Sequence, residues 1–116
     1  MLPFKNRLVK RKDFEKVQKI GQFFSEGNIA IKVAPNGMPD TRVGVAVGLK
    51  FSKRAVERNQ MKRQLRDIAQ KKLKEMKKGM DVAVMIRKRE GERIFANKLR
   101  KNMESVLAKS GLVNEK

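Results

Sequence analysis

The stretch RNQMKRQLRD, Arg58 to Asp67, holds the residues of this sequence that are best suited to chemistry, and that chemistry is phosphate binding. Arginine binds phosphate oxygens through a bidentate guanidinium fork, whereas lysine offers a point charge. With about 100° of rotation per residue in a helix, most of the polar side chains fall on one face, and Arg58 stands apart at the first turn. The residues of that face are Asn59, Lys62, Arg63 and Arg66. Such a face can hold several phosphates and sugars at once.

The same basic face is open to a second interpretation, in which water alone solvates it. A solvated helix usually carries acidic partners three or four residues from its basic ones. Between Lys53 and Lys78 there are eleven Lys or Arg, but the acids are only Glu57, Asp67 and Glu75. Because so many like charges repel one another, the sequence favours a bound polyanion over solvation.

The composition supports a nucleic-acid partner and argues against an active site within the protein. The 116 residues suit one domain, residues 1–116, and 30 Lys plus Arg against 12 Asp plus Glu give a net charge of +18. Cys and His are absent, which removes thiolate metal sites and the commonest general base. The carboxylates are scattered, so we expect neither catalytic residues nor metal ligands in the protein. The longest apolar run, Val43 to Leu49, is too short for a membrane span, and we expect a cytoplasmic protein.

Apolar residues at helical spacing predict three helices that would position these side chains. The first ends at Gly21, the second runs from Ser52 to about Lys78, and the third from about Arg93 to Lys109. The first helix carries Phe14 and Val17 on one side, and Ser52 is the predicted N-cap of the second. The apolar stripes of the second and third helices are Met61, Leu65, Ile68, Ala69 and Met76, and then Phe95, Leu99, Val106 and Leu107.

Alternating residues predict the strands GNIAIKVAP, TRVGVAVGL and DVAVMIR, and QFFSE is a further short strand. One face of these strands consists of Val and Ile and would form the core. The other face is shallow and partly basic, with Arg42, Gly44, Ala46 and Ala83. Small residues there either admit a ligand or make room for the first helix, and both can hold at once. The elements together predict an α/β fold, a single-domain α-β sandwich.

The stretch KRAVERNQMKRQLRD resembles the arginine-rich signature of the bacterial ribonuclease P protein subunit. Three other stretches resemble that family in the same order along the chain, and the likeness extends from about Asn6 to Leu107. They are NRLVKRKDFEKVQKIG, RVGVAVGLKFSKRA and GMDVAVMIRKR. The positions that match the signature are Arg58, Asn59, Lys62, Arg63 and Arg66.

This resemblance implies a fold of the ribosomal protein S5 domain 2-like kind, in the order α-β-β-β-α-β-α with a left-handed crossover. It implies a protein that joins a catalytic RNA, as a one-to-one heterodimer without any membrane. That ribonuclease P RNA carries out the Mg²⁺-dependent hydrolysis that removes the 5′ leader of precursor tRNA, and the Mg²⁺ is bound mainly by the RNA. The chain would be an enzyme only as the protein subunit of this endoribonuclease.

The resemblance also assigns residues to two surfaces. The first binds the catalytic RNA through Arg54, Arg58, Asn59, Lys62, Arg63 and Arg66. The second is a cleft between the first helix and the sheet, which holds the leader through Phe14, Val17, Lys32, Lys50, Lys53, Arg87 and Lys88. The chain departs from the usual family pattern at Gln18, where many members have an aromatic residue, at Gln60, where many have arginine, and at Gly48 and Leu49.

Other interpretations remain open at the level of the sequence. One is a non-catalytic ribosomal or chaperone-like RNA-binding protein on the same fold, which would sediment with ribosomes and not rescue leader removal at low Mg²⁺. A DNA-binding helical module fits less well, because it needs a short turn between two helices, whereas strands flank the long helix here. The amphipathic spacing of Phe14 also fits a core residue as well as a ligand contact.

Overall fold

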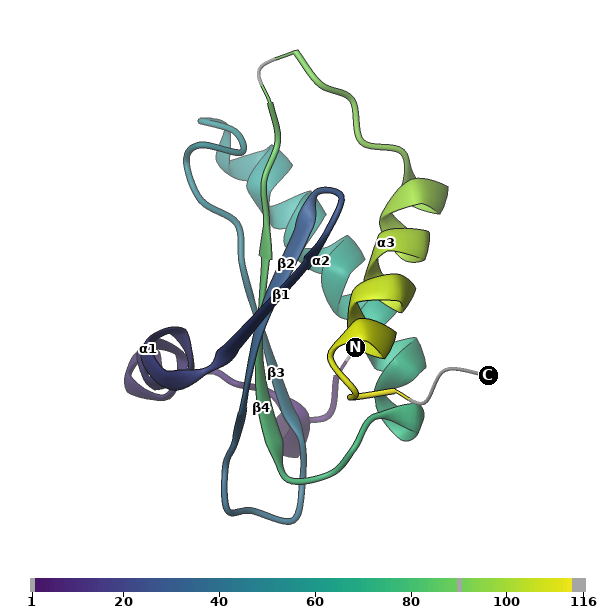
Figure 1. Cartoon of the computed structure of the whole chain (residues 1–116). Coiled ribbons are helices and arrows are strands. Elements are labelled where there is room, and N and C mark those ends of the chain that lie inside the picture. Colours follow the sequence, from purple (N-terminus) through teal and green to yellow (C-terminus); the bar gives the residue numbers. More distant parts are fainter. Residues whose placement is uncertain (1, 90, 114–116) are drawn as a thin grey trace.

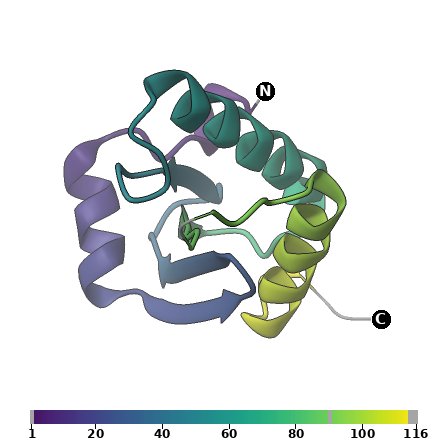
Figure 2. The ribbon, with the colours of Figure 1, turned by 90° about the horizontal axis from the view of Figure 1, so that it is seen from above.

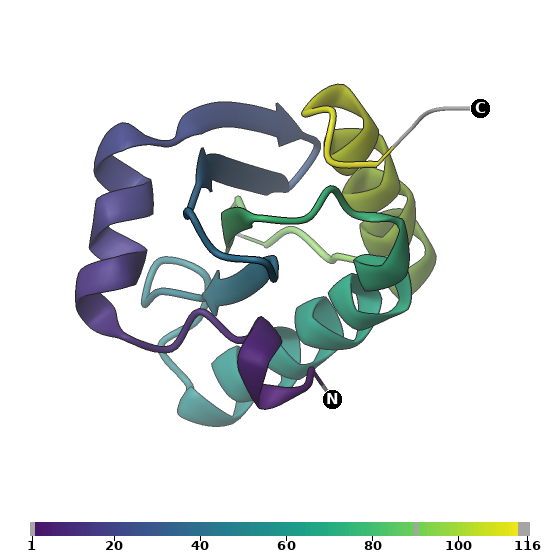
Figure 3. The ribbon, with the colours of Figure 1, turned by 90° about the horizontal axis from the view of Figure 1, so that it is seen from below.

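Four strands form one sheet with helices on both of its faces in the computed structural model, which describes residues 2–89 and 91–113 (Figure 1). The helix α1 covers one face, and α2 and α3 cover the other (Figures 2 and 3). The elements are η1 (Phe4–Asn6), α1 (Arg11–Ile20), β1 (Gln22–Glu26), β2 (Ile29–Pro35), β3 (Arg42–Ala46), α2 (Ala55–Lys72), η2 (Leu73–Glu75), β4 (Met80–Ile86) and α3 (Ala96–Lys109). The predicted α/β sandwich and its order of helices and strands are confirmed, including the short strand β1.

The order of strands in the sheet is β1-β2-β4-β3. The pairs β1–β2 and β2–β4 are antiparallel, whereas β3 and β4 are parallel and are joined by the crossover through α2. Viewed from the side of α2 with both strands pointing up, β4 lies to the left of β3, so the crossover is left-handed (Figures 1 and 2). This is the rare hand for such a connection.

The main core lies between the sheet and the helices α2 and α3. Strand alternation places the Val and Ile side chains on this face, as the period of two predicts. The most deeply buried of them are Ile29, Ile31, Val82 and Val84, against Leu65, Leu99, Met103, Val106 and Leu107 from the helices. A smaller cluster of Leu8, Val17 and Ala83, with Phe14 packed against it, lies under α1. The two faces of the sheet are therefore packed very differently.

The long helix is shorter at both ends than the sequence predicted. It begins at Ala55, and Ser52 is not its N-cap, because the residue before the helix is Arg54, which makes no capping bond with its side chain. The Ser52 hydroxyl instead accepts a hydrogen bond from the Arg54 amide at 3.1 Å. The α-helix ends at Lys72 and continues as the 3-10 turn η2, after which Met76 pairs with Val113 in an isolated β-bridge. The bridge draws the chain into an extended conformation before Lys78.

The last helix also begins later than predicted, at Ala96 instead of Arg93. Phe95 therefore precedes the helix, and its side chain is 59% exposed. The neighbouring Ile94 packs against the core instead, and Met103 of α3 is fully buried. The predicted apolar stripe was correct for Leu99, Val106 and Leu107 and wrong for Phe95.

Among the described residues, no helix combines the length and the apolar character that crossing a membrane would require.

Candidate nucleic-acid interface

The face of the sheet that α1 covers, which we call the α1 face, is built from rows of small side chains. The register places Ser25, Ala30, Met85 and Ala46 in one row, each from a different strand. Except for Ala30, which is buried, these residues are only partly covered. On this side of the sheet α1 is a single short helix (Figure 2), and part of the row stays uncovered.

A groove of about 480 Å³ opens beside α1, at the edge of the sheet formed by β3. Its apolar wall consists of Phe14 and the β3 residues Val43, Gly44, Val45 and Ala46, together with Leu2, Leu8 and Val9. Three arginines from separate segments, Arg7, Arg11 and Arg66, complete the lining. An aromatic ring, a shallow floor and several guanidinium groups together suit an unpaired stretch of nucleic acid, whose bases stack and whose phosphates are anionic.

Gly44 and Ala83 show why small residues lie on the α1 face. A Cβ atom on Gly44 would lie 2.8 Å from the Leu8 carbonyl oxygen and 3.0 Å from Cδ2 of Phe14, so glycine is required for packing. Ala83 is fully buried in the cluster under α1. Room for the first helix is therefore one confirmed reason for small residues. Room for a ligand stays a prediction, and it concerns Ala46, which borders the groove, and Gly48, which has no atom within 4 Å of its Cβ position.

Phe14 and Val17 come from the same side of α1 but have different surroundings. Phe14 is half-buried, packs against the small cluster and still lines the groove. Val17 is only 2% exposed, so it supports α1 from beneath. The two interpretations of Phe14, as core and as contact residue, are thus compatible in this geometry.

Lys32 lies on the α1 face at the opposite end of α1 from Phe14. Its ammonium group donates a hydrogen bond to the backbone carbonyl of Gln18, near the C-terminus of α1. The Gln18 amide in turn donates to the sulfur of Met85 at 2.9 Å. Lys32 and Gln18 therefore tie the end of α1 to the sheet.

The other predicted cleft lysines and Arg87 gather where β3 and β4 end. These strands are parallel, so the segments that follow them begin at the same end of the sheet. The loop after β3 contains Lys50 and Lys53, and the segment after β4 contains Arg87 and Lys88. The Lys88 ammonium lies 5.1 Å from the centroid of the Phe51 ring, which connects the two segments directly. Lys50, Lys53 and Arg87 are exposed.

The helix α2 carries the arginine-rich signature, and we call it the signature helix. It presents its basic side chains as helical phase predicted. Met61 and Leu65 face the core, whereas Asn59, Arg63 and Arg66 are exposed. Lys62 is half-buried at the margin of the exposed face. Within the described part of the chain, neither Arg63 nor Arg66 forms an ion pair. Two guanidinium groups on one helix thus remain open to an external anion.

Arg54 and Arg58 are more constrained than the rest of this set. A guanidinium nitrogen of Arg58 donates to the Ser52 carbonyl at 2.9 Å, so this side chain braces the loop before α2. Arg54 is exposed and lies 3.9 Å from the Glu57 carboxylate. The sequence placed Arg58 apart from the face, and the structure gives the reason.

Arg66 links the two predicted surfaces, which the sequence analysis treated as separate. It belongs to the exposed face of α2, yet it lines the groove with Phe14. No local signal in the sequence reports this proximity, because it depends on how α2 crosses behind β3. Arg7 and Arg11 in the groove were also missed, since they lie outside the signature.

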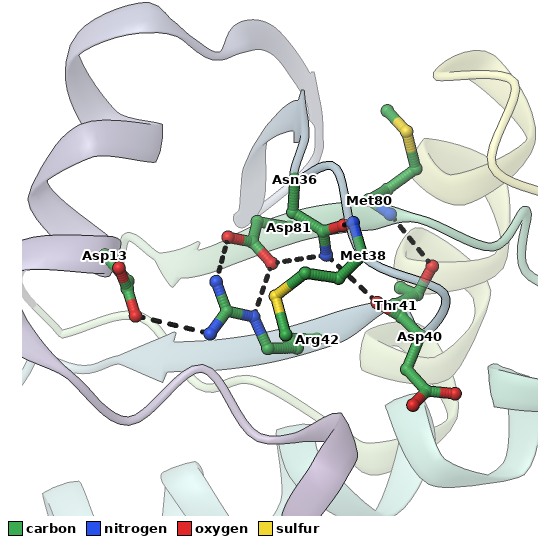
Figure 4. A network of polar contacts seen from close by, with 8 residues as sticks. All are labelled: Asp13, Asn36, Met38, Asp40, Thr41, Arg42, Met80 and Asp81. Carbon is green, nitrogen blue, oxygen red and sulfur yellow. Dashed lines mark hydrogen bonds and ion pairs between the residues drawn. The ribbon is translucent and has the colours of Figure 1, made fainter.

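Arg42 was expected to add positive charge to the α1 face, but the structure neutralises it (Figure 4). Its guanidinium group donates to both carboxylate oxygens of Asp81, at 2.8 and 2.7 Å, and to Asp13 of α1 at 3.2 Å. The hydrogen bond to Asp81 is the largest cause that raises the pKa of Arg42 above its ordinary value. Asn36 donates to the same Asp81 carboxylate at 2.9 Å. This network attaches α1 and the loop before β3 to the sheet.

The acidic side chains give no sign of a metal centre. Across residues 2–89 and 91–113, no three Asp or Glu side chains come together as ligands of a metal ion would.

Comparisons with known proteins agree with this geometry. The sequence profile of the family described as Ribonuclease P matches residues 2–111. The ribonuclease P protein component of a Pseudanabaena species is 39% identical over 87 residues, which cover 74% of this chain and 75% of that protein. The one from Microcystis aeruginosa is 29% identical over 117 residues and covers 97% of both chains.

Solved structures extend the likeness to three dimensions. The RNase P protein from Thermotoga maritima, in complex with 1-(4-fluorophenyl)-2-thiourea, superposes with a TM-score of 0.78 at 31% identity, covering 87% of this chain and 96% of that one. The Staphylococcus aureus RNase P protein gives 0.82 at 22% identity, over 94% and 98%, which supports the fold alone. The chain belongs to the ribonuclease P protein family.

Proposed function

We propose that this chain is the protein subunit of ribonuclease P and acts in the cytoplasm as a one-to-one complex with the catalytic RNA. The exposed face of α2 binds that RNA, and the groove beside α1 holds the 5′ leader of precursor tRNA. The observation that carries the proposal is Arg66, which belongs to the signature helix and lines the same groove as Phe14. A protein that joins a leader to an RNA active site needs this kind of continuity.

The exposed face of α2 carries side chains that can bind phosphate. Arg63 and Arg66 are exposed without an acidic partner in the described residues, so their guanidinium groups are available for bidentate contacts. Asn59 lies on the same face and can bond a sugar hydroxyl or a phosphate. Each phosphate neutralised releases counterions, so this contact should weaken steeply with salt.

The groove suits a single strand because its lining combines an aromatic ring with three arginines, of which Arg11 is paired with Glu15 at 2.8 Å. The Phe14 ring offers a π-face for a base, and the small side chain of Ala46, which borders the groove, lets a backbone approach closely. The nearest buried carboxylate, Asp81, is already paired with Arg42, so it does not repel phosphate. The groove can therefore accept a polyanion.

Hydrolysis is assigned to the RNA in this proposal, and its magnesium ions are RNA-bound. Magnesium there would activate water and stabilise the charge that develops at the scissile phosphate. The protein's residues bind and orient: α2 fixes the protein on the RNA, and the groove fixes the strand to be removed. Holding a substrate in register in this way lowers the barrier without any protein group taking part in bond cleavage.

Reconstitution tests the proposal directly. The catalytic RNA, with and without this protein, is given a precursor tRNA at low Mg²⁺, and cleavage at the 5′ end of the mature tRNA is measured. We expect the protein to restore cleavage, and the complex to bind the precursor more tightly than mature tRNA. Co-sedimentation with ribosomes without any effect on cleavage would support the non-catalytic RNA-binding alternative instead.

A further inference from the structure

Phe23, the second residue of β1, is an aromatic side chain that the core does not use. Its side chain is 52% exposed, whereas the next residue, Phe24, packs against the main core. Phe23 pairs with Lys32 across the β1–β2 ladder, and cross-strand partners lie on the same face of a sheet. Because the Lys32 ammonium bonds to α1, this is the α1 face. Phe23 thus lies on the groove side of the sheet.

The register places Phe23 at one end of a row that crosses the whole sheet. The row runs Phe23, Lys32, Ala83 and Gly44, one residue from each strand. Phe14 meets the other end, where its ring would lie 3.0 Å from a Cβ atom on Gly44. Three steps between strands of about 4.8 Å each separate the two ends by about 14 Å. Two aromatic rings therefore mark the two ends of the α1 face.

We propose that Phe23 stacks on a nucleotide of the leader, at the end of the α1 face farther from the signature helix. This inference rests on the proposed function, which places the leader on that face. Arg66 of α2 lines the groove at the Phe14 end, so the nucleotides nearest the catalytic RNA lie there. The strand then runs over the partly covered row of Ser25, Met85 and Ala46 towards β1.

The exposure of Phe23 suits a base, because about half of the side chain is open to solvent. Lys32 is the cross-strand partner of Phe23, and its ammonium group is bonded to the Gln18 carbonyl. The separation of about 14 Å between the two ends of the row is enough for the two rings to contact different nucleotides of one strand. Phe14 and Phe23 should thus act on different parts of one leader.

The experiment measures the affinity of the holoenzyme for a series of precursor tRNAs whose leaders lengthen one nucleotide at a time. The variant Phe23→Leu keeps apolar bulk at the site but removes the stacking face, and Phe23→Tyr restores the ring. Phe95→Leu is the matched control, because Phe95 is similarly exposed but lies before α3. We expect Phe23→Leu to weaken binding by about fivefold or more for long leaders and to leave short leaders unaffected. Phe23→Tyr and Phe95→Leu should match the unaltered protein throughout.

Two results would overturn the inference, and both differ from a failure of the proposed function. The first is a Phe23→Leu protein whose affinity equals that of the unaltered protein at every leader length. The second is an equal loss for short and long leaders. If the unaltered holoenzyme itself binds precursor and mature tRNA equally, the proposed function fails before Phe23 is considered. Melting temperatures of all four proteins confirm that the comparison is made between folded states.

Discussion

The two faces of the sheet use the same strands for different purposes. Towards α2 and α3, alternate residues such as Val82 and Val84 are almost wholly buried. Towards α1, their neighbours are small, and a groove remains open next to Phe14. A face covered by two helices supplies stability, whereas a face covered by one short helix retains surface for a ligand. The contrast suggests that substitutions on the two faces should separate folding from RNA binding.

The charged residues repeat this contrast between structure and binding. Arg42 forms ion pairs with Asp81 and Asp13, which neutralise its charge and attach α1 to the sheet. Arg66 is exposed and has no acidic partner among the described residues. Arg66 lines the groove beside α1, whereas Arg42 lines a separate pocket with Asp13 and Asp81, so only Arg66 of the two is available to an external phosphate. A net charge of +18 therefore overstates the number of binding groups.

The largest effect is expected from Arg42→Ala, which removes the ion pair that fastens α1. It leaves the carboxylate of Asp81, whose side chain is 8% exposed, without its cation, so we expect a loss of about 3–5 kcal/mol in unfolding free energy. Urea denaturation measures it. The double variant Arg42→Met with Asp81→Leu should lose less, because it buries no unpaired charge. An equal or greater loss in the double variant would contradict this role.

The pH dependence of the Arg42–Asp81 ion pair follows from the direction in which the pKa of Arg42 is shifted. Because Asp81 raises the pKa of Arg42, the stabilisation is complete below the ordinary pKa of arginine. It is lost only as the pH rises through the higher pKa of the folded state. Arg42 itself should therefore contribute no change in stability near neutral pH.

A slightly smaller loss is expected from Leu65→Ala on the core face. Leu65 is fully buried against the sheet, so the cavity should cost about 2–5 kcal/mol. Well below the melting temperature, the variant should still bind the catalytic RNA with unchanged affinity, because its side chain points away from the basic face. A stable Leu65→Ala protein with weakened RNA binding would break the separation of the two faces.

Arg63→Ala should have the opposite signature, with an effect on RNA binding and almost none on folding. We expect the slope of log affinity against log salt to fall by about one and stability to change by less than about 0.5 kcal/mol. Filter binding to the catalytic RNA over a range of salt concentrations measures the slope. Arg100→Ala, an exposed arginine on α3, is the matched control and should leave the slope unchanged. Arg58 is a poorer probe, because it also braces the loop at Ser52.

The regular parts of this molecule were predictable from the sequence because their signals are local. Alternation separated Val82 and Val84 from Ala83, and helical phase separated Leu65 from Arg66. The helix beginnings at Ser52 and Arg93 were mispredicted, since α2 begins at Ala55 and α3 at Ala96. Apolar periodicity alone does not distinguish the first buried residue of a helix from an exposed apolar residue just before that helix.

The parts of the site that were not predictable depend on contacts between distant segments. Arg42 meets Asp81 across 39 residues and Asp13 across 29, so no local pattern revealed that its charge was paired. Arg7 lies in the N-terminal segment and Arg66 lies in α2, within the left-handed crossover. Both line the same groove. The resemblance assigned residues to two surfaces, and the fold showed where those surfaces meet.

The most direct test of the central claim, that the groove beside α1 holds the leader, compares precursor and mature tRNA binding by a holoenzyme with Phe14→Leu. Loss of one stacked base costs about 1–3 kcal/mol. The precursor should therefore lose affinity by about that amount, while mature tRNA binding and assembly with the catalytic RNA stay unchanged. An equal loss for precursor and mature tRNA, in a protein that remains folded, would contradict it.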